Sequence, residues 1–205
     1  ALGDIDLDRM YFTQSADTLI LVHEDMSPKS IVRGANNSTW TFSTISLTSP
    51  KVAYSLSTSN PATTITPDGI DGTVEITAGS SVFTSSHVDQ YINVLNGFGR
   101  ARIIEQVSGT VVRVITEIPF FKASVAIASG DWELEEGYED AWSGSRGYPR
   151  TCSFHEGRLY FGGSKSLPNT LFGSKVSDFF NFKTAEALDD DAILVNMNTD
   201  SVNAI

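Results

Sequence analysis

The sequence has one cysteine, three histidines and no long apolar run, and each shortage removes a class of protein. A lone Cys152 cannot form an internal disulfide and excludes a CxxC metal or redox motif. His23, His87 and His155 show no HxH or HxxxH spacing, so no zinc site is expected. Because no window of about 18 apolar residues exists, no membrane span is predicted.

Basic residues are also scarce: 14 Lys and Arg stand against 25 Asp and Glu, a formal net charge of −11. Tight binding to nucleic-acid phosphates requires clustered Lys and Arg, so this composition argues against it. The one candidate basic stripe, Arg33, Arg100, Arg102 and Arg113, lies among more numerous acids. A surface past which nucleic acid slides without sticking is compatible with the charge, because like charges repel.

The chain is instead rich in Ser and Thr, 25 and 19 residues, which favours strands and turns over long helices. The stretch 147–182 predicts a meander of short strands at Thr151–Phe154, Arg158–Gly163 and Thr170–Ser174, because aromatics alternate between turn residues. Such a meander cannot bury both faces alone and needs neighbours.

A second meander is predicted near the start of the chain. Apolar runs at Met10–Thr13 and Thr18–His23 flank a polar turn, and a turn at Glu24–Lys29 leads into Ser30–Arg33 and then Trp40–Phe42. The two meanders share a short sequence similarity: Asp8-Arg9-Met10-Tyr11-Phe12 matches Gly157-Arg158-Leu159-Tyr160-Phe161. Repeated four-strand units are typical of propeller blades.

A separate strand-rich region is expected between the meanders. The Pro-, Ser- and Thr-rich segment 49–72 reads as a connection with one weak strand at Val52–Leu56. From Thr73 to Leu134, strands alternate with the hairpin dipeptides Asn96-Gly97 and Ser108-Gly109, which indicates a small barrel or sandwich. Its expected strands include 121–127, and the adjacent Ile103 and Ile104 require either opposite faces or a bulge.

The last part of the chain gives weaker signals. The acidic segment Asp131–Asp140 is expected to be the final barrel strand running into an exposed linker. Ser177 and Asp178 are candidate N-caps of a helical turn, and Ala185–Leu188 is a candidate second turn. Ala192–Met197 is predicted to be a strand.

Residues that could carry chemistry have simpler interpretations. Cys152, His155 and Asp178 are the only trio fit for nucleophilic catalysis, but the first two should point to opposite faces of a strand, so a buried, inert Cys is favoured. Asp189-Asp190-Asp191 lacks the glycine and distal Glu of a calcium loop. Gly97-Phe98-Gly99-Arg100 lacks the helix and Lys of a phosphate loop and fits a hairpin turn.

Aromatic residues leave two alternatives open. They crowd the later meander as Phe154, Tyr160, Phe161, Phe172, Phe179, Phe180 and Phe182. A packed core between sheets is the preferred interpretation, and a base- or sugar-stacking platform is the other. Tyr138, Trp142 and Tyr148 exposed in one groove would favour a carbohydrate-binding module that recognises host surface glycans.

Several long motifs resemble a known family. These are the runs Gly147–Gly163 (GYPRTCSFHEGRLYFGG), Leu171–Phe182 (LFGSKVSDFFNF), Asp189–Ile193, Ser15–His23 and Gly97–Ile103. Together they are similar to the tail tubular protein B, nozzle or tail-hub proteins of short-tailed bacteriophages. Members form a hexamer-like ring below the portal and adaptor, contain propeller-like domains, and enclose the channel through which DNA leaves the capsid. They are several times longer than this chain, so a fragment is expected.

We therefore expect an all-β chain of propeller-type blade meanders, 1–66 with 136–205, and an inserted small β-barrel at 67–135. The resemblance implies a structural virion protein of the phage tail, made in the host cytoplasm, and not an enzyme. Its implied partners are other copies in a ring, neighbouring tail and adaptor proteins, and DNA that passes without tight binding. No catalytic, cofactor-binding or metal-binding residues are assigned.

Overall fold

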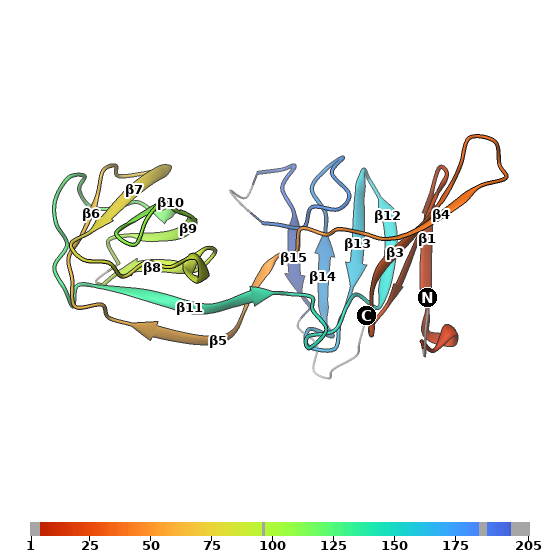
Figure 1. The fold of residues 1–205 in the computed structure, drawn as a ribbon, viewed down its shortest axis with the longest axis horizontal. Coiled ribbons are helices and arrows are strands. Elements are labelled where there is room, and N and C mark those ends of the chain that lie inside the picture. Colours follow the sequence, from red (N-terminus) through yellow and green to blue (C-terminus); the bar gives the residue numbers. More distant parts are fainter. Residues whose placement is uncertain (1–4, 96, 185–187, 198–205) are drawn as a thin grey trace. The chain divides into compact units, whose positions relative to one another are not determined.

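The computed structural model describes residues 5–95, 97–184 and 188–197, and they form an all-β chain (Figure 1). The strands make three antiparallel sheets, with short 3-10 turns at Leu7–Arg9 and Ser85–His87. The chain divides into two compact units, 1–51 with 140–205 and 52–139. The expected barrel limits of 67–135 differ from this division, because the second unit also holds the strands that precede residue 67.

The first sheet is a meander of four strands in the order in which they occur in the chain: β1 (Tyr11–Ser15), β2 (Thr18–His23), β3 (Met26–Arg33) and β4 (Trp40–Thr44). The turn predicted at Glu24–Lys29 is shorter than expected, because β3 already begins at Met26 and contains Pro28. The β2–β3 pairing is irregular at this point, so the missing N–H of Pro28 falls where the ladder is interrupted.

The second sheet of this unit is also a four-strand meander: β12 (Thr151–His155), β13 (Arg158–Gly162), β14 (Thr170–Gly173) and β15 (Ile193–Asn196). The helical turn expected after Ser177 is absent from the described residues there, because Ser177 has a φ of +62° and Lys175 bridges Asp178. The turn expected at Ala185–Leu188 falls largely outside the described residues.

The two sheets begin with matching hairpins. Each has a two-residue turn, Ala16-Asp17 in one and Glu156-Gly157 in the other, and a positive φ at the first turn residue. By this register Leu19 corresponds to Leu159. The short sequence similarity between Asp8–Phe12 and Gly157–Phe161 therefore does not mark equivalent strands. Tyr11 begins the first strand of its sheet, whereas Arg158 begins the second strand of the other sheet.

Aromatic side chains form the centre of the core that these sheets share. Trp142, on the connection into β12, has edge contacts with Phe161, Phe172 and Phe182 at centroid distances of 4.8–5.6 Å. All four side chains are buried. Aromatic pairs in such edge geometry add to the stabilisation from buried area. These contacts support the core interpretation of the aromatic-rich stretch.

The second unit contains a seven-stranded sheet with spatial order β5-β11-β8-β9-β10-β7-β6. Alternate residues point inward, for example Val74 and Ile76 from one strand and Val112 and Val114 from its neighbour, and these are buried. Trp132 is fully buried in the same core. The strands are β5 (Lys51–Ser59), β6 (Ile65–Pro67), β7 (Thr73–Ala78), β8 (Tyr91–Val94), β9 (Arg100–Gln106), β10 (Val111–Ile118) and β11 (Trp132–Asp140).

Three details of this sheet differ from or refine the expectations. β5 is a nine-residue strand, longer than the predicted Val52–Leu56. The strand predicted at 121–127 is wrong, because only Ile127 makes a bridge, to Ile65. Ile104 is skipped in the pairing of β9 with β10, so the bulge alternative is confirmed.

Candidate functional site

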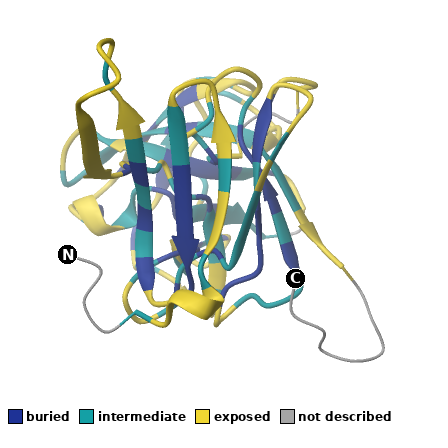
Figure 2. Cartoon of the chain, turned by 90° about the vertical axis from the view of Figure 1, so that its right-hand side faces the viewer, coloured by how far each residue is buried: buried dark blue, intermediate teal, exposed yellow. Residues whose placement is uncertain are grey.

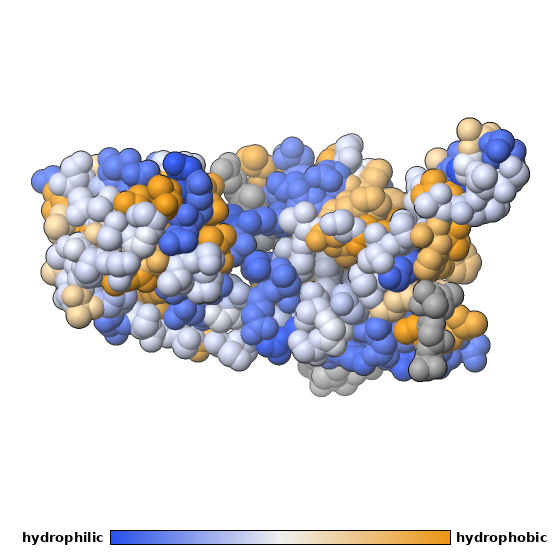
Figure 3. Space-filling view, viewed as in Figure 1, coloured by the Kyte–Doolittle hydropathy of each residue, from blue (hydrophilic) through white to orange (hydrophobic). Residues whose placement is uncertain are grey.

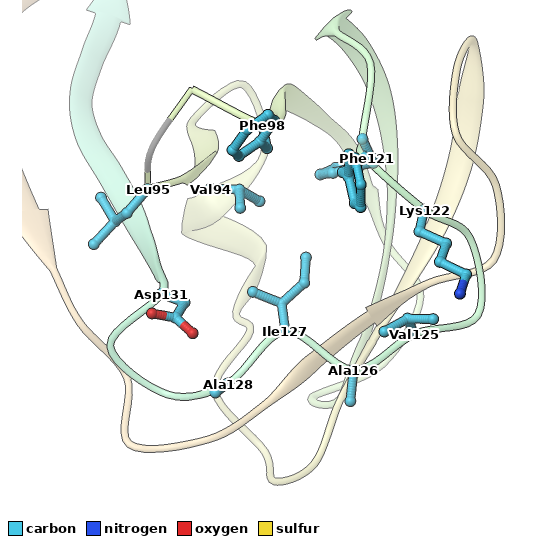
Figure 4. Close-up of a pocket in the computed structure, with 11 residues that line it drawn as sticks. Val94, Leu95, Phe98, Phe121, Lys122, Val125, Ala126, Ile127, Ala128 and Asp131 are labelled. Atoms are coloured by element: carbon cyan, nitrogen blue, oxygen red, sulfur yellow. The ribbon is translucent and has the colours of Figure 1, made fainter.

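An apolar pocket of about 390 Å³ opens on the second unit (Figure 4). Three segments line it: the end of β8 with the following turn, the residues after β10, and the irregular stretch before β11. The lining residues are Val94, Leu95, Phe98, Phe120, Phe121, Lys122, Val125, Ala126, Ile127, Ala128 and Asp131. Lys122 and Asp131, the two charged residues among them, lie on opposite sides of the pocket.

The β8–β9 turn positions one wall of this pocket. Gly99 has a φ of +144°, and a Cβ there would lie 2.5 Å from the Phe120 ring, so glycine is required for this close approach. Phe98 and Phe121 meet edge to face at 5.5 Å and are 53% and 78% exposed. The turn is thus a hairpin that presents an aromatic residue. Asn96, half of the predicted hairpin dipeptide, is outside the described residues.

The pocket is mainly apolar. The described residues that line it include no Ser, Cys or His, and its Lys and Asp lie apart. Apolar walls with a few charged groups at the edge suit an aliphatic or aromatic group of a ligand or partner. In the sequence the signal for this pocket is the adjacent pair Phe120-Phe121, but the other walls come from distant segments.

A dense polar network surrounds Arg100 on the same unit. Its guanidinium donates to Glu117 (3.1 Å), Asn93 (2.7 Å), Glu135 (2.9 Å) and the Tyr138 hydroxyl (3.0 Å). The guanidinium carbon also lies 4.1 Å from the centroid of the Tyr91 ring. All three guanidinium nitrogens are used, so Arg100 is not available to a phosphate backbone.

The network shifts the pKa values of its members. The hydrogen bond from Arg100, with those from Tyr138 and Asn93, holds the pKa of the Glu135 carboxyl down at about 2. Burial and the hydrogen bond to Glu117 raise the pKa of Tyr91. The network is therefore a fixed ion pair with neutral tyrosines at neutral pH.

The other arginines of the candidate basic stripe are also paired. Arg102 donates to Asp89 at 3.1 Å in a largely buried pair. Arg113 bonds Glu105, and Arg33 donates its Nε–H to Asp17 at 2.9 Å. The four arginines of the candidate basic stripe are thus each paired with a carboxylate.

The candidate nucleophile trio has separate local roles. The Cys152 thiol lies 4.0 Å from the Ile20 carbonyl oxygen, and burial raises its pKa to about 12. His155 is exposed beside Glu156, and Asp178 accepts a hydrogen bond from the Asn181 amide at 3.0 Å. A thiol with so high a pKa has almost no thiolate at neutral pH.

Backbone carbonyl groups of the acidic turn Asp189-Asp190-Asp191 bind an arginine side chain. The buried guanidinium of Arg158 donates to the carbonyl oxygens of Ser174 and Asp189, each at 2.6 Å, and also to that of Asp191. The Asp191 carboxylate lies 3.0 Å from the Lys175 ammonium. Among the described residues, no three His, Cys, Asp or Glu side chains gather in a group that could hold a metal ion.

The three aromatics named for a carbohydrate-binding groove are each buried or partly buried. Trp142 is buried in the core of the first unit, only 6% exposed. Tyr138 belongs to the Arg100 network, and its ring lies 4.7 Å from that of Tyr91. Tyr148 is partly buried, and its N–H donates to the Glu24 carbonyl.

A second apolar surface covers one face of the first sheet. We call it the Leu19 face; its apolar residues include Phe12, Leu19, Ile31, Trp40 and Phe42, which the strand register places on one side together with the polar Gln14, Lys29, Arg33 and Thr44. Figure 2 looks onto this sheet, whose outer strands are exposed, and Figure 3 shows apolar atoms at the β1–β4 end of the unit. The alternation Trp40-Thr41-Phe42 was its signal in the sequence, but burial could not be read from it.

No protein-family model matches the chain, and no curated protein matches it. Within the described part of the chain, no helix has the length and apolar character of a membrane span.

Proposed function

We propose that this chain is a structural protein of the tail of a short-tailed bacteriophage, part of a tube or nozzle ring that lines the DNA ejection channel. The observation that supports this proposal most strongly is the pair of four-strand meanders with matching hairpins in the first unit. Repeated sheets of this kind are how propeller blades are built. Four of the five motifs that resemble the tail family lie in this unit, and we propose that its sheets are propeller-type blades.

We further propose that the second unit is a small barrel. Support comes from hydrogen bonds that link the β6 edge of its sheet to the stretch before β11. Ile65 and Ile127 exchange two backbone hydrogen bonds, at 3.1 and 2.7 Å. The Trp132 indole, at the start of β11, donates to the Thr63 carbonyl at 2.9 Å. These contacts bring the β6 edge close to the start of β11, the second strand from the other edge, and an approach of this kind is what a barrel requires.

Charge supports the role of a channel wall. The net charge is −11, and Arg33, Arg100, Arg102 and Arg113 are engaged by carboxylates. A wall of this kind repels a DNA cargo and does not hold it. The polar residues singled out in the sequence make structural contacts, which suits a scaffold.

The experiment is immunogold labelling, with antibodies against this chain, of purified particles of the phage that encodes it. We expect label at the tail below the portal. Deleting the gene should give particles that are defective in DNA delivery. Absence of the protein from purified virions, or label confined to the capsid, would overturn the proposal. A mobility-shift assay checks the charge argument, and tight DNA binding at physiological salt would contradict it.

A further inference from the structure

Backbone hydrogen bonds hold the wall of the apolar pocket in place. The stretch between β10 and β11 forms much of this wall and lies outside the regular strands. Three of its N–H groups nevertheless donate to carbonyl groups of another segment: Phe120 to Ile70 and Ser124 to Pro67, both at 2.8 Å, and Ile127 to Ile65 at 2.7 Å. A wall fixed at three points is pre-organised, so a ligand does not have to order it on binding.

The pocket has an apolar interior and an aromatic mouth. Its interior includes the buried Phe120 and the partly buried Val94 and Ile127, whereas Phe98 and Phe121 at the mouth are exposed. Figure 4 shows the Ile127 side chain directed toward these two rings. A third ring can extend their edge-to-face contact, since aromatic rings prefer such contacts at centroid distances of about 4.5–7 Å.

The exposure of the mouth also limits what the pocket can enclose. Phe98 is 53% exposed and Phe121 78%. A small-molecule site typically buries about 70–90% of its ligand and has a volume of roughly 300–1,000 Å³. This pocket, at about 390 Å³, is at the lower end of that range and is open. It therefore suits one large side chain of a longer molecule better than a whole small molecule.

Lys122 differs from the other cations of the second unit. The unit contains four Lys and Arg residues, and its three arginines are each engaged by a carboxylate. Among the residues that the structure describes, neither the Lys122 ammonium nor the Asp131 carboxylate has an ion-pair partner. The pocket thus has one unpaired charge of each sign, and the two lie on opposite sides of it (Figure 4).

This arrangement of charges selects among ligands. An uncharged apolar group gains nothing from either charge, and a ligand of one sign is attracted to one side and repelled by the other. An aromatic group with a cation on one side and an anion on the other is complementary to the whole pocket. In an extended peptide, residues near an aromatic residue supply such flanking charges.

We propose that this pocket binds a short extended peptide segment of a partner protein. An aromatic side chain of the segment enters between Phe98, Phe121 and Ile127, a basic side chain pairs with Asp131, and an acidic side chain pairs with Lys122. The aromatic anchor supplies most of the affinity, and the exposed charges supply selectivity. The inference goes beyond the proposed role in a phage tail and does not depend on it.

The first test is an NMR titration of the whole 15N-labelled chain with the capped peptide Lys-Gly-Phe-Gly-Glu. The glycines leave the flanking side chains free to reach either side. We expect shifts at Phe98, Phe121 and Ala128, and binding at least about 10-fold weaker when Ala replaces Phe in the peptide. No shifts at these residues with millimolar peptide, or equal binding of the Ala peptide, would overturn the inference.

Peptides with other charges test the roles of Lys122 and Asp131. Because a peptide can lie in either direction, the signs of its two charges are varied and not their order. Wild type should bind Lys-Gly-Phe-Gly-Glu about 3-fold or more tightly than Lys-Gly-Phe-Gly-Lys or Glu-Gly-Phe-Gly-Glu. The net charge of −11 alone favours the doubly basic peptide, so a preference for that peptide would contradict the proposal.

Charge reversal should change this selectivity in a defined way. Asp131→Lys should make Glu-Gly-Phe-Gly-Glu the tightest of the three peptides, and Lys122→Glu should make Lys-Gly-Phe-Gly-Lys the tightest. Asp190→Lys, at an exposed position on the first unit, changes the net charge equally and should keep the wild-type order. Reversal variants that keep the wild-type order would show that these two charges do not contact the ligand.

The aromatic mouth is tested by Phe98→Ala/Phe121→Ala, which should weaken binding of Lys-Gly-Phe-Gly-Glu at least about 10-fold. Phe12→Ala removes a similarly exposed ring, 68% exposed, from the first unit and is the matched control. Two other occupants are checked directly with indole and with phosphatidylcholine vesicles. Indole that binds the pocket as tightly as the charged peptide, or vesicle binding that requires Phe98 and Phe121, would overturn the assignment to a peptide.

Discussion

The guanidinium of Arg150 donates its Nε–H to the carboxylate of Glu24 at 2.7 Å, although the two residues are 126 positions apart. Glu24 is only 6% exposed, and the same carboxylate also meets Arg9. The Glu24 carbonyl accepts the N–H of Tyr148 at 2.9 Å. The turn between β2 and β3 is thereby fixed to the chain that enters β12, which joins the two halves of the first unit.

Arg150→Met should lower the free energy of unfolding by about 2 kcal/mol, because the buried carboxylate keeps only the more exposed Arg9 as a partner. Urea denaturation followed by circular dichroism measures the loss. Arg33→Met is the matched control: it removes an exposed pair with Asp17 and should cost at most about 0.5 kcal/mol. Equal losses in the two variants would show that burial of Glu24 does not matter.

Gly137→Ala should be among the most damaging single substitutions in the second unit. Gly137 has a φ of +105°, and a Cβ there would lie 2.2 Å from the Ser55 carbonyl oxygen of β5. Strain and the forced separation of β5 from β11 should together cost about 3 kcal/mol or more. Thermal unfolding measures the cost.

Gly130→Ala separates the two causes. Gly130 also has a positive φ, +88°, but nothing lies within 4 Å of its added Cβ. Backbone strain alone should cost about 1 kcal/mol there. If both variants lose the same stability, the close approach of β5 to β11 is not what requires glycine at position 137.

Local turn chemistry explains why much of the fold could be predicted. The run Thr18–His23 is a strand in the structure with the predicted bounds, because four consecutive apolar residues follow a polar turn. The length of β5 is underestimated from the sequence because the strand is rich in Ser and lies between Pro50 and Pro61, a composition typical of a connection. Its pairing with β11, about 80 residues further on, supplies the hydrogen bonds that local propensity does not.

The surfaces were harder to predict than the strands. The apolar stretch at 121–127 has strand-like composition, yet it lines the pocket instead, since residues from the β8–β9 turn form the opposite wall. The burial of Trp142 depends on Phe161, Phe172 and Phe182, which lie on elements that only the tertiary fold brings together. Sequence alternation identifies which residues share a face, but not which face is covered.

Acid should weaken the second unit through Glu135. Its folded-state pKa is about 2, below the ordinary value of 4.5, so its contribution is complete above the unfolded pKa and is lost as the pH falls from about 5 toward 2. With solvent screening allowed for, that contribution is about 1–2 kcal/mol.

Glu135→Gln should flatten this part of the pH profile, because the amide does not titrate and pairs less strongly with Arg100. Denaturation midpoints at a series of pH values between 2 and 7 test the point. A Glu135→Gln profile that parallels wild type would refute the assignment.

The Cys152 thiol should be unreactive in the folded chain. Its pKa of about 12 and its position against the Ile20 carbonyl leave little thiolate and little access at pH 8. Iodoacetamide should label the native protein at least about 100-fold more slowly than the urea-unfolded protein, as measured by intact mass. Cys152→Ala, which removes one partly buried sulfur, should cost about 1 kcal/mol. Rapid labelling of the native chain would mean that an activated thiol exists, and the inert, structural role of this residue would have to be abandoned.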